Sequence, residues 1–300
     1  MTKVEGADVP PAAKLKDILE KTTKFFREKD CDSPRLDAEL LLAKALGLRR
    51  IDLYLKYDQP LSEAELASCR ELVRRRSKGE PVAYILGQKE FYGLNFFVDK
   101  NVLIPRPETE LLVEAVLEST KKRAITRETL EILDLGCGSG CIGLSLLHLN
   151  KNARATLLDI SEAAVGVAKK NAESLELADR CNLICGDAAE SSFGERSFDI
   201  IVANPPYISP TDTRVQDDVV NFEPHLALFS PNDGLAANFS WSKNLVSHLR
   251  PKGIMCFEFG IDQSPMVLQH FEKLGIFSEL KIIKDLAGID RHILAIRKDS

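Results

Sequence analysis

The sequence predicts an α/β protein built on a mainly parallel, seven-stranded sheet, preceded by a small helical domain. From residue 130 onward, apolar runs alternate with helical stretches, the pattern of a parallel sheet with helices on both faces. Before that, residues 12–78 have helical periodicity, and residues 84–104 change to the shorter period of a hairpin. We therefore expect a helical domain over 1–79, a β-hairpin linker over 80–104 and an α/β domain over 105–300.

The helical part contains recognisable helix ends. A helix over Leu36–Leu46 is expected to end at Gly47, and Ser62 with Glu65 forms a capping box that starts another helix. In the linker, aromatic residues flank Gly93-Leu94-Asn95, which predicts a hairpin.

The first helix of the α/β part is expected to begin at Pro107, because proline lacks the N–H that would have no partner in the first turn. Seven apolar runs then follow as expected strands. These runs are Leu130–Leu135, Ala155–Leu158, Leu183–Cys185, Ile200–Ala203, Ile254–Phe259, Leu280–Ile283 and His292–Ile296.

Composition excludes several classes of protein. The net charge of −5 is unlike that of a general nucleic-acid binder, and residues 101–300 carry 21 Lys and Arg against 28 Asp and Glu. The basic run Arg74-Arg75-Arg76 is interpreted as a solvated helix face. No apolar run approaches the length of a membrane span, and the N-terminus lacks the order of a signal peptide. We expect a cytoplasmic protein with no membrane partner.

The seven cysteines indicate neither a disulfide framework nor a metal site. Cys137 and Cys141 are separated by three residues, as are Cys181 and Cys185, and neither pair has the two-residue spacing of a zinc knuckle. Reduced thiols and no metal are expected.

A glycine-rich turn and two acids predict a cofactor pocket. Gly136-Cys137-Gly138-Ser139-Gly140 follows an expected strand and precedes a helix, and Asp159 ends the next strand. Glycines let backbone approach a ligand closely, and an acid at that place can bind both ribose hydroxyls. A dinucleotide site has similar features. The Gly-x-Gly-x-Gly pattern after Asp134, however, resembles motif I of class I S-adenosylmethionine (SAM)-dependent methyltransferases. The resemblance implies that Asp187 and the adjoining Ala188 contact the adenine. The structural alternative is that Asp159 and Asp187 only cap turns.

An acceptor site is predicted at Asn204-Pro205-Pro206-Tyr207, which follows the buried run 198–203. Two prolines fix the backbone and remove two donors, so the Pro205 carbonyl can point into a pocket. Together with the side-chain oxygen of Asn204 it can hold both hydrogens of one NH2 group, while the Tyr207 ring packs on the planar group. The motif predicts alkylation of a planar amide or amine nitrogen; a rigid Pro-Pro turn without catalytic role is the structural alternative.

The chain as a whole resembles the HemK/PrmC family, which methylates the glutamine of the Gly-Gly-Gln motif in bacterial peptide chain release factors. The resemblance is carried by residues 80–87, 91–94, 103–110, 133–140, 204–208, 222–224, 226–228, 234–235, 258–263 and 285–291. It implies a helical bundle, a hairpin linker and a class I methyltransferase domain. It also implies S-adenosyl-L-methionine as cofactor, S-adenosyl-L-homocysteine as product, and a release factor as partner.

Three other functions remain open at this point. A ribosomal-protein glutamine methyltransferase has a similar acceptor motif but differs at Pro105–Glu110. A DNA or RNA amino-methyltransferase acting on adenine N6 would use the same tetrapeptide on a flipped base, and it would need a basic groove that the acidic domain disfavours. A catalytically silent binding module is disfavoured by the intact motifs. The expected protein is a monomer that binds no nucleic acid directly.

Overall fold

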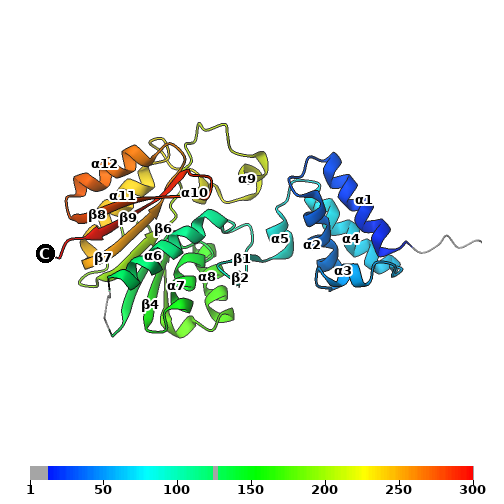
Figure 1. Ribbon diagram of the computed structural model, residues 1–300, viewed down its shortest axis with the longest axis horizontal. Coiled ribbons are helices and arrows are strands. Elements are labelled where there is room, and N and C mark those ends of the chain that lie inside the picture. The colour runs from blue at the N-terminus through cyan, green and yellow to red at the C-terminus, as the bar shows by residue number, and fades with distance from the viewer. Residues whose placement is uncertain (1–12, 124–127, 300) are drawn as a thin grey trace, which may run out of the picture. The chain divides into compact units, whose positions relative to one another are not determined.

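The computed structural model describes residues 13–123 and 128–299, and its residue contacts divide the chain into two compact units, Met1–Leu86 and Gly87–Ser300. Figure 1 shows the elements of each unit along the chain. The first twelve residues of the expected helical domain lie outside the described residues. The boundary between the units lies after the short helix α5 (Val82–Leu86), whereas the sequence suggested an end of the helical domain at residue 79. The division into 1–79, 80–104 and 105–300 stays a prediction.

The first unit is helical. Its other elements are α1 (Leu15–Glu28), α2 (Pro34–Leu46), α3 (Asp52–Leu55) and α4 (Glu63–Arg76). They pack around buried apolar side chains that include Leu19, Phe26, Leu41 and Leu42. The expected signals are present, since Ser62 and Glu65 form the capping box of α4, and Gly47 ends α2 with a left-handed φ of 62°.

The basic run on α4 is paired within this unit. Arg74 bonds Glu71, Arg75 bonds Glu80, and Arg76 lies 2.8 Å from Asp37 on α2. The Arg76 side chain is only 12% exposed. The interpretation of a fully solvated face is therefore wrong for Arg76, because its guanidinium joins two packed helices.

The second unit starts with the hairpin of β1 (Lys89–Phe91) and β2 (Leu94–Phe96). Phe91 pairs with Leu94, so the turn is the two residues Tyr92 and Gly93, which have φ values of 51° and 75°. The expected hairpin is present, and the two positive φ values make the short connection that matches strand twist.

The main sheet has seven strands in the order β5-β4-β3-β6-β7-β9-β8. The pairs among β5, β4, β3, β6 and β7 are parallel, and β9 pairs antiparallel with β7 and β8. The strands are β3 (Leu130–Leu135), β4 (Ala153–Asp159), β5 (Cys181–Cys185), β6 (Phe198–Ala203), β7 (Leu249–Glu258), β8 (Phe277–Lys284) and β9 (Asp290–Arg297). The predicted mainly parallel, seven-stranded sheet is confirmed.

Helices cover both faces of this sheet (Figure 1). One face packs against α6 (Glu110–Lys122), α7 (Cys141–Leu149) and α8 (Glu162–Ser174). The other packs against α11 (Ala236–Leu245) and α12 (Ser264–Leu274). Short helices α9 (Asp217–Phe222) and α10 (His225–Leu228) lie between β6 and α11, and 3-10 turns occupy Pro107–Thr109, Ala178–Arg180 and Val246–His248.

The ends of the parallel strands position the candidate site. Leu135 pairs with both Leu158 and Ala203, and Asp159 pairs with Cys185. The segments after β3, β4, β5 and β6 therefore start at one edge of the sheet, where ligands bind in open α/β folds. No helix among the described residues is long and apolar enough to cross a membrane.

Candidate active site

The glycine-rich turn links β3 to α7 at this edge. Gly136, Gly138 and Gly140 have φ values of 60°, 54° and 79°, which favour glycine. A Cβ on Gly136 would also lie 2.8 Å from the ring of Trp241 on α11. The first glycine thus needs both its backbone conformation and its missing side chain.

Asp159 ties this turn to the end of β4. One carboxylate oxygen accepts the Gly138 N–H at 2.8 Å, and the other accepts the Ser161 N–H at 2.9 Å. Burial raises the pKa of Asp159. Each oxygen of an ionised carboxylate has a second lone pair, so both remain able to accept from a ligand.

Asp187 and Ala188 follow β5 and, together with Asp159, line one cavity at this edge of the sheet. The Asp187 carboxylate accepts the Ala189 N–H at 2.8 Å, and the Asn244 amide donates to the Ala188 carbonyl at 3.0 Å. Asp159 and Asp187 therefore do cap turns, as the structural alternative had it. Both also line the cavity, so turn capping and ligand contact are compatible.

The acceptor motif follows β6. The Asn204 amide donates to Thr109 Oγ1 at 3.2 Å, and Asn204 Oδ1 is buried without a hydrogen-bond partner within the described part of the chain. Tyr207 donates its hydroxyl hydrogen to Glu258 at 3.2 Å. Burial, with the nearby charge of Glu258, raises the pKa of Tyr207, which keeps the phenol protonated. A buried amide oxygen without a partner is unfavourable unless a ligand supplies a donor.

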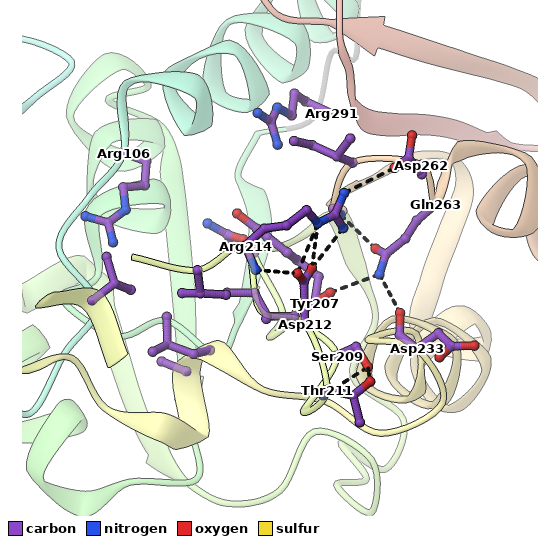
Figure 2. A pocket seen from close by; sticks show the side chains of 18 of the residues that line it. Arg106, Tyr207, Ser209, Thr211, Asp212, Arg214, Asp233, Asp262, Gln263 and Arg291 are labelled. Carbon is purple, nitrogen blue, oxygen red and sulfur yellow. Dashed lines mark hydrogen bonds and ion pairs between the residues drawn. The ribbon is translucent and has the colours of Figure 1, made fainter. Parts of the chain in front are cut away.

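Two cavities meet at this motif. The first, of about 450 Å³, is lined by the predicted cofactor residues Gly136, Cys137, Gly138, Ser139, Asp159, Asp187 and Ala188, together with Asn204 and Pro206. The second, of about 680 Å³, contains Asn204 and Tyr207 in its wall. Figure 2 shows Tyr207 among the side chains that line it. Asn204 lines both, so its side chain lies at the junction. Gly140 and Pro205 line neither; Pro205 is buried.

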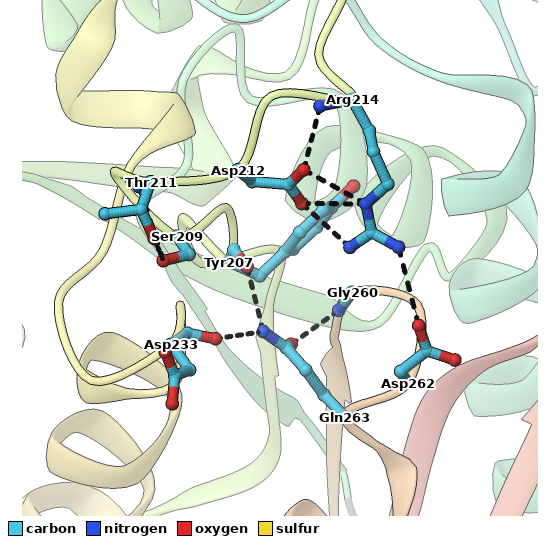
Figure 3. Close-up of polar contacts among 9 residues, drawn as sticks. All are labelled: Tyr207, Ser209, Thr211, Asp212, Arg214, Asp233, Gly260, Asp262 and Gln263. Carbon is cyan, nitrogen blue, oxygen red and sulfur yellow. Dashed lines mark hydrogen bonds and ion pairs between the residues drawn. The ribbon is translucent and has the colours of Figure 1, made fainter.

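The backbone of Tyr207 is held on the side of the larger cavity. Gln263 donates to the carbonyl oxygens of Tyr207 at 2.9 Å and Asp233 at 2.8 Å, and it accepts the Gly260 N–H at 2.7 Å (Figure 3). Next to Asp233, Gly234 approaches the same Tyr207 carbonyl so closely that a Cβ there would lie 2.0 Å from the oxygen. These contacts fix the end of the acceptor motif.

Charged side chains in the wall of the larger cavity are mostly paired. Arg214 bonds Asp212 at 2.8 Å and reaches Asp262 at 3.5 Å (Figure 3). Arg106 bonds Glu223 at 2.5 Å, and the other Glu223 oxygen accepts the Ile104 N–H at 3.0 Å. Because Glu223 follows α9, this pair joins the Pro105–Glu110 stretch to the segment before α10.

Sequence patterns assign no role to several residues of the site. Thr109, Glu258, Gln263 and Gly234 lie within stretches of family resemblance, and Trp241 lies outside them. One signal was available, since Glu258 is a charge inside the apolar run Ile254–Phe259, where an unpaired charge is disfavoured. Among the described residues no group of three His, Cys, Asp or Glu side chains could hold a metal ion.

The fold and site together define a class I methyltransferase. Residues 17–87 match the model of the PrmC N-terminal domain, and residues 107–221 match the methyltransferase small domain. A "Release factor glutamine methyltransferase" of Rhodopirellula baltica is 41% identical over 286 residues, covering 94% of this chain and 95% of that protein. One of Chlorobaculum tepidum is 40% identical, covering 92% and 94%. The chain therefore belongs to the release factor glutamine methyltransferase family.

A solved structure shows the same fold at low sequence identity. The hMettl16 catalytic domain, in complex with the MAT2A 3'UTR hairpin 6, superposes with a TM-score of 0.53 at 16% identity, covering 70% of this chain and 77% of that one. This likeness concerns the α/β architecture alone.

Proposed function

We propose that this enzyme transfers a methyl group from SAM to the side-chain amide nitrogen (N5) of the glutamine in the Gly-Gly-Gln motif of bacterial peptide chain release factors, with S-adenosyl-L-homocysteine as product. The observation that carries the proposal is Asn204 Oδ1, a buried acceptor without a partner among the described residues, at the junction of two cavities. The family membership supports the choice of a protein glutamine as acceptor.

The smaller cavity fits a nucleoside-type methyl donor. Its volume of about 450 Å³ is within the range of small-molecule sites. The Asp159 and Asp187 carboxylates retain acceptor capacity for ribose hydroxyls and the adenine amino group. Ala188 lines the same cavity and is proposed to lie beside the adenine. When bound, SAM supplies an electrophilic methyl group on a positively charged sulfonium.

The acceptor residues hold the nitrogen. Asn204 Oδ1 accepts one hydrogen of the substrate amide, and the Pro205 carbonyl is assigned the other. Pro206 keeps the turn rigid, and the Tyr207 ring packs on the planar group. An amide nitrogen is a poor nucleophile, and holding both hydrogens supports positive charge as it develops there. Holding reactants in line contributes up to about 7–11 kcal/mol to such reactions.

No general base is assigned in this mechanism. Glu258 is the carboxylate bonded to the acceptor motif, but its two oxygens are bonded to Thr109, His292 and Tyr207 and not directed at the substrate. A base must come within hydrogen-bond reach of the proton that it removes. We therefore assign the proton to solvent after methyl transfer.

The larger cavity is proposed to receive the glutamine-bearing loop. Its volume of about 680 Å³ exceeds the need of one side chain, and part of its wall comes from Val219, Ala227, Leu228 and Asp233. Residues 219–234, with the helical unit, are proposed to grip the release factor. Arg74, Arg75 and Arg76 each pair with a carboxylate, which supports an enzyme without direct nucleic-acid contact. A cytoplasmic monomer is part of the same proposal.

The test is to incubate the chain with a release factor and SAM and to map the added mass by peptide fragmentation. We expect one methyl group on the glutamine of Gly-Gly-Gln and none on a release factor in which that glutamine is replaced by glutamate. A methyl group on another residue, or methylation of an adenine-containing oligonucleotide in place of the release factor, would refute the proposal.

A further inference from the structure

Glu258 is a buried carboxylate that joins three parts of the second unit. It ends β7 and is 2% exposed. It contacts Thr109 Oγ1 at 2.8 Å, the Tyr207 hydroxyl at 3.2 Å and His292 Nε2 at 3.2 Å. Burying a carboxylate is strongly unfavourable without such donors. Thr109, Tyr207 and His292 therefore direct hydrogens toward the Glu258 carboxylate.

The hydrogen of the Thr109 hydroxyl is directed to Glu258, because an ionised carboxylate can only accept. The hydroxyl oxygen is then left to accept from Asn204, whose amide nitrogen lies 3.2 Å away. This order of donors fixes the amide of Asn204: its NH2 group faces Thr109, and Oδ1 is free for a ligand. With the opposite order, the amide would turn over and present a donor to the substrate.

The same carboxylate also holds the far end of the acceptor motif. Its other oxygen accepts from Tyr207, whose carbonyl is bonded by Gln263. His292 is fully buried and donates to Glu258 in the tautomer that carries its hydrogen on Nε2. One charged group thus orients both polar side chains of the acceptor motif, Asn204 and Tyr207.

We propose that Glu258, acting through the Thr109 hydroxyl, is the positioning residue that turns Asn204 Oδ1 toward the substrate nitrogen. This inference rests on the proposed function, since it assigns Asn204 as the acceptor of an amide hydrogen. Neither Glu258 nor the Thr109 hydroxyl accepts the substrate proton. Their effect is on orientation, and a misplacement of about 1 Å lowers rates by about 100-fold.

The first measurement compares methyl transfer by four variants at saturating SAM and release factor. Thr109→Val keeps the shape and removes the hydroxyl. Glu258→Gln adds a donor that lets Thr109 donate to Asn204 and reverse its amide. Both should lower kcat by about 10- to 100-fold. Thr109→Ser restores the hydroxyl, so kcat should return to within about threefold of the wild type. The matched control is Thr120→Val, on α6, whose hydroxyl bonds the Val116 carbonyl at 2.7 Å.

The dissociation constant for SAM distinguishes a change in the orientation of Asn204 from a general loss of structure at the site. It should stay within about threefold of the wild-type value in Thr109→Val and Glu258→Gln, by calorimetry. A loss of kcat with intact SAM binding, and its rescue by serine, is the pattern expected of a positioning role.

The second measurement follows the Asn204 side chain itself, by the nitrogen-15 and proton signals that disappear in Asn204→Asp. In Thr109→Val these signals should shift, and their exchange with water should rise about tenfold, as expected for one lost hydrogen bond. Signals and kcat equal to those of Thr120→Val would overturn the inference. If the wild type fails to methylate a release factor, the proposed function fails, and the amide signals still decide whether Thr109 holds Asn204.

Discussion

Gly234 offers a sharp test of how the acceptor motif is held. A Cβ at this position would lie 2.0 Å from the Tyr207 carbonyl oxygen and 2.7 Å from Gln263 Nε2, where ordinary contacts begin near 3.4 Å. The two segments must therefore separate by about 1.4 Å to accept Gly234→Ala. Its φ of 83° adds about 1–2 kcal/mol of strain, and overpacking adds about 1–3 kcal/mol.

We expect Gly234→Ala to lower the free energy of unfolding by about 2–5 kcal/mol. Because the displacement falls on the backbone of Tyr207, kcat should also fall by about 100-fold. The matched control is Gly288→Ala, since Gly288 has a φ of 82° and no atom within 4 Å of the added Cβ. That variant should lose only about 1–2 kcal/mol and keep its activity.

Urea denaturation followed by the fluorescence of Trp241, the single tryptophan, reports the stability of the second unit. Methyl transfer to a release factor at saturating substrates reports kcat. If Gly234→Ala matched Gly288→Ala in both measurements, the close approach to Tyr207 would have no energetic consequence and the reasoning would be refuted.

Three further predictions concern the cofactor side. Burial raises the pKa of Asp134 to about 7, so the stability that its protonation contributes is fully present below pH 3.8 and is lost as pH rises through about 7. Between pH 5 and 8, urea denaturation should show that the wild type loses about 2.5 kcal/mol more unfolding free energy than Asp134→Asn. Equal losses in the two proteins would contradict this. Asp159→Asn should weaken SAM binding by about 10- to 100-fold in calorimetry, because a hydrogen bond to a charged group is replaced by one to a neutral amide; unchanged affinity would exclude Asp159 from the cofactor site. Trp241 lines the smaller cavity, so SAM should change its fluorescence with a midpoint equal to the calorimetric dissociation constant, and a flat titration would contradict this placement.

The sheet was predictable because buried parallel strands have continuous apolar sequences. Leu130–Leu135 matches β3 residue for residue, and the other six apolar runs overlap the six remaining strands. The turn at Tyr92-Gly93 was not predictable from turn preferences, because tyrosine rarely adopts the positive φ that it has there.

The candidate site was predictable where its residues follow strands. Asp159 is the last residue of β4, and Asp187 and Asn204 come shortly after β5 and directly after β6. Parallel strands bring their ends, and the segments that follow them, to one edge. The supporting contacts were not predictable in this way. Asn204 bonds Thr109 across 95 positions of the chain, and Gln263 bonds Tyr207 across 56. Such pairs depend on strand order and register, which local sequence patterns do not contain.

The central claim is that Asn204 Oδ1 holds the nitrogen that is methylated, and Asn204→Ala tests it most directly. Removing one preorganised hydrogen-bonding group from an active site lowers kcat by about 100- to 1000-fold. The account predicts a loss of this size in methyl transfer to the release factor, with most of the SAM affinity retained in calorimetry. Turnover within a few-fold of the wild type would contradict the claim.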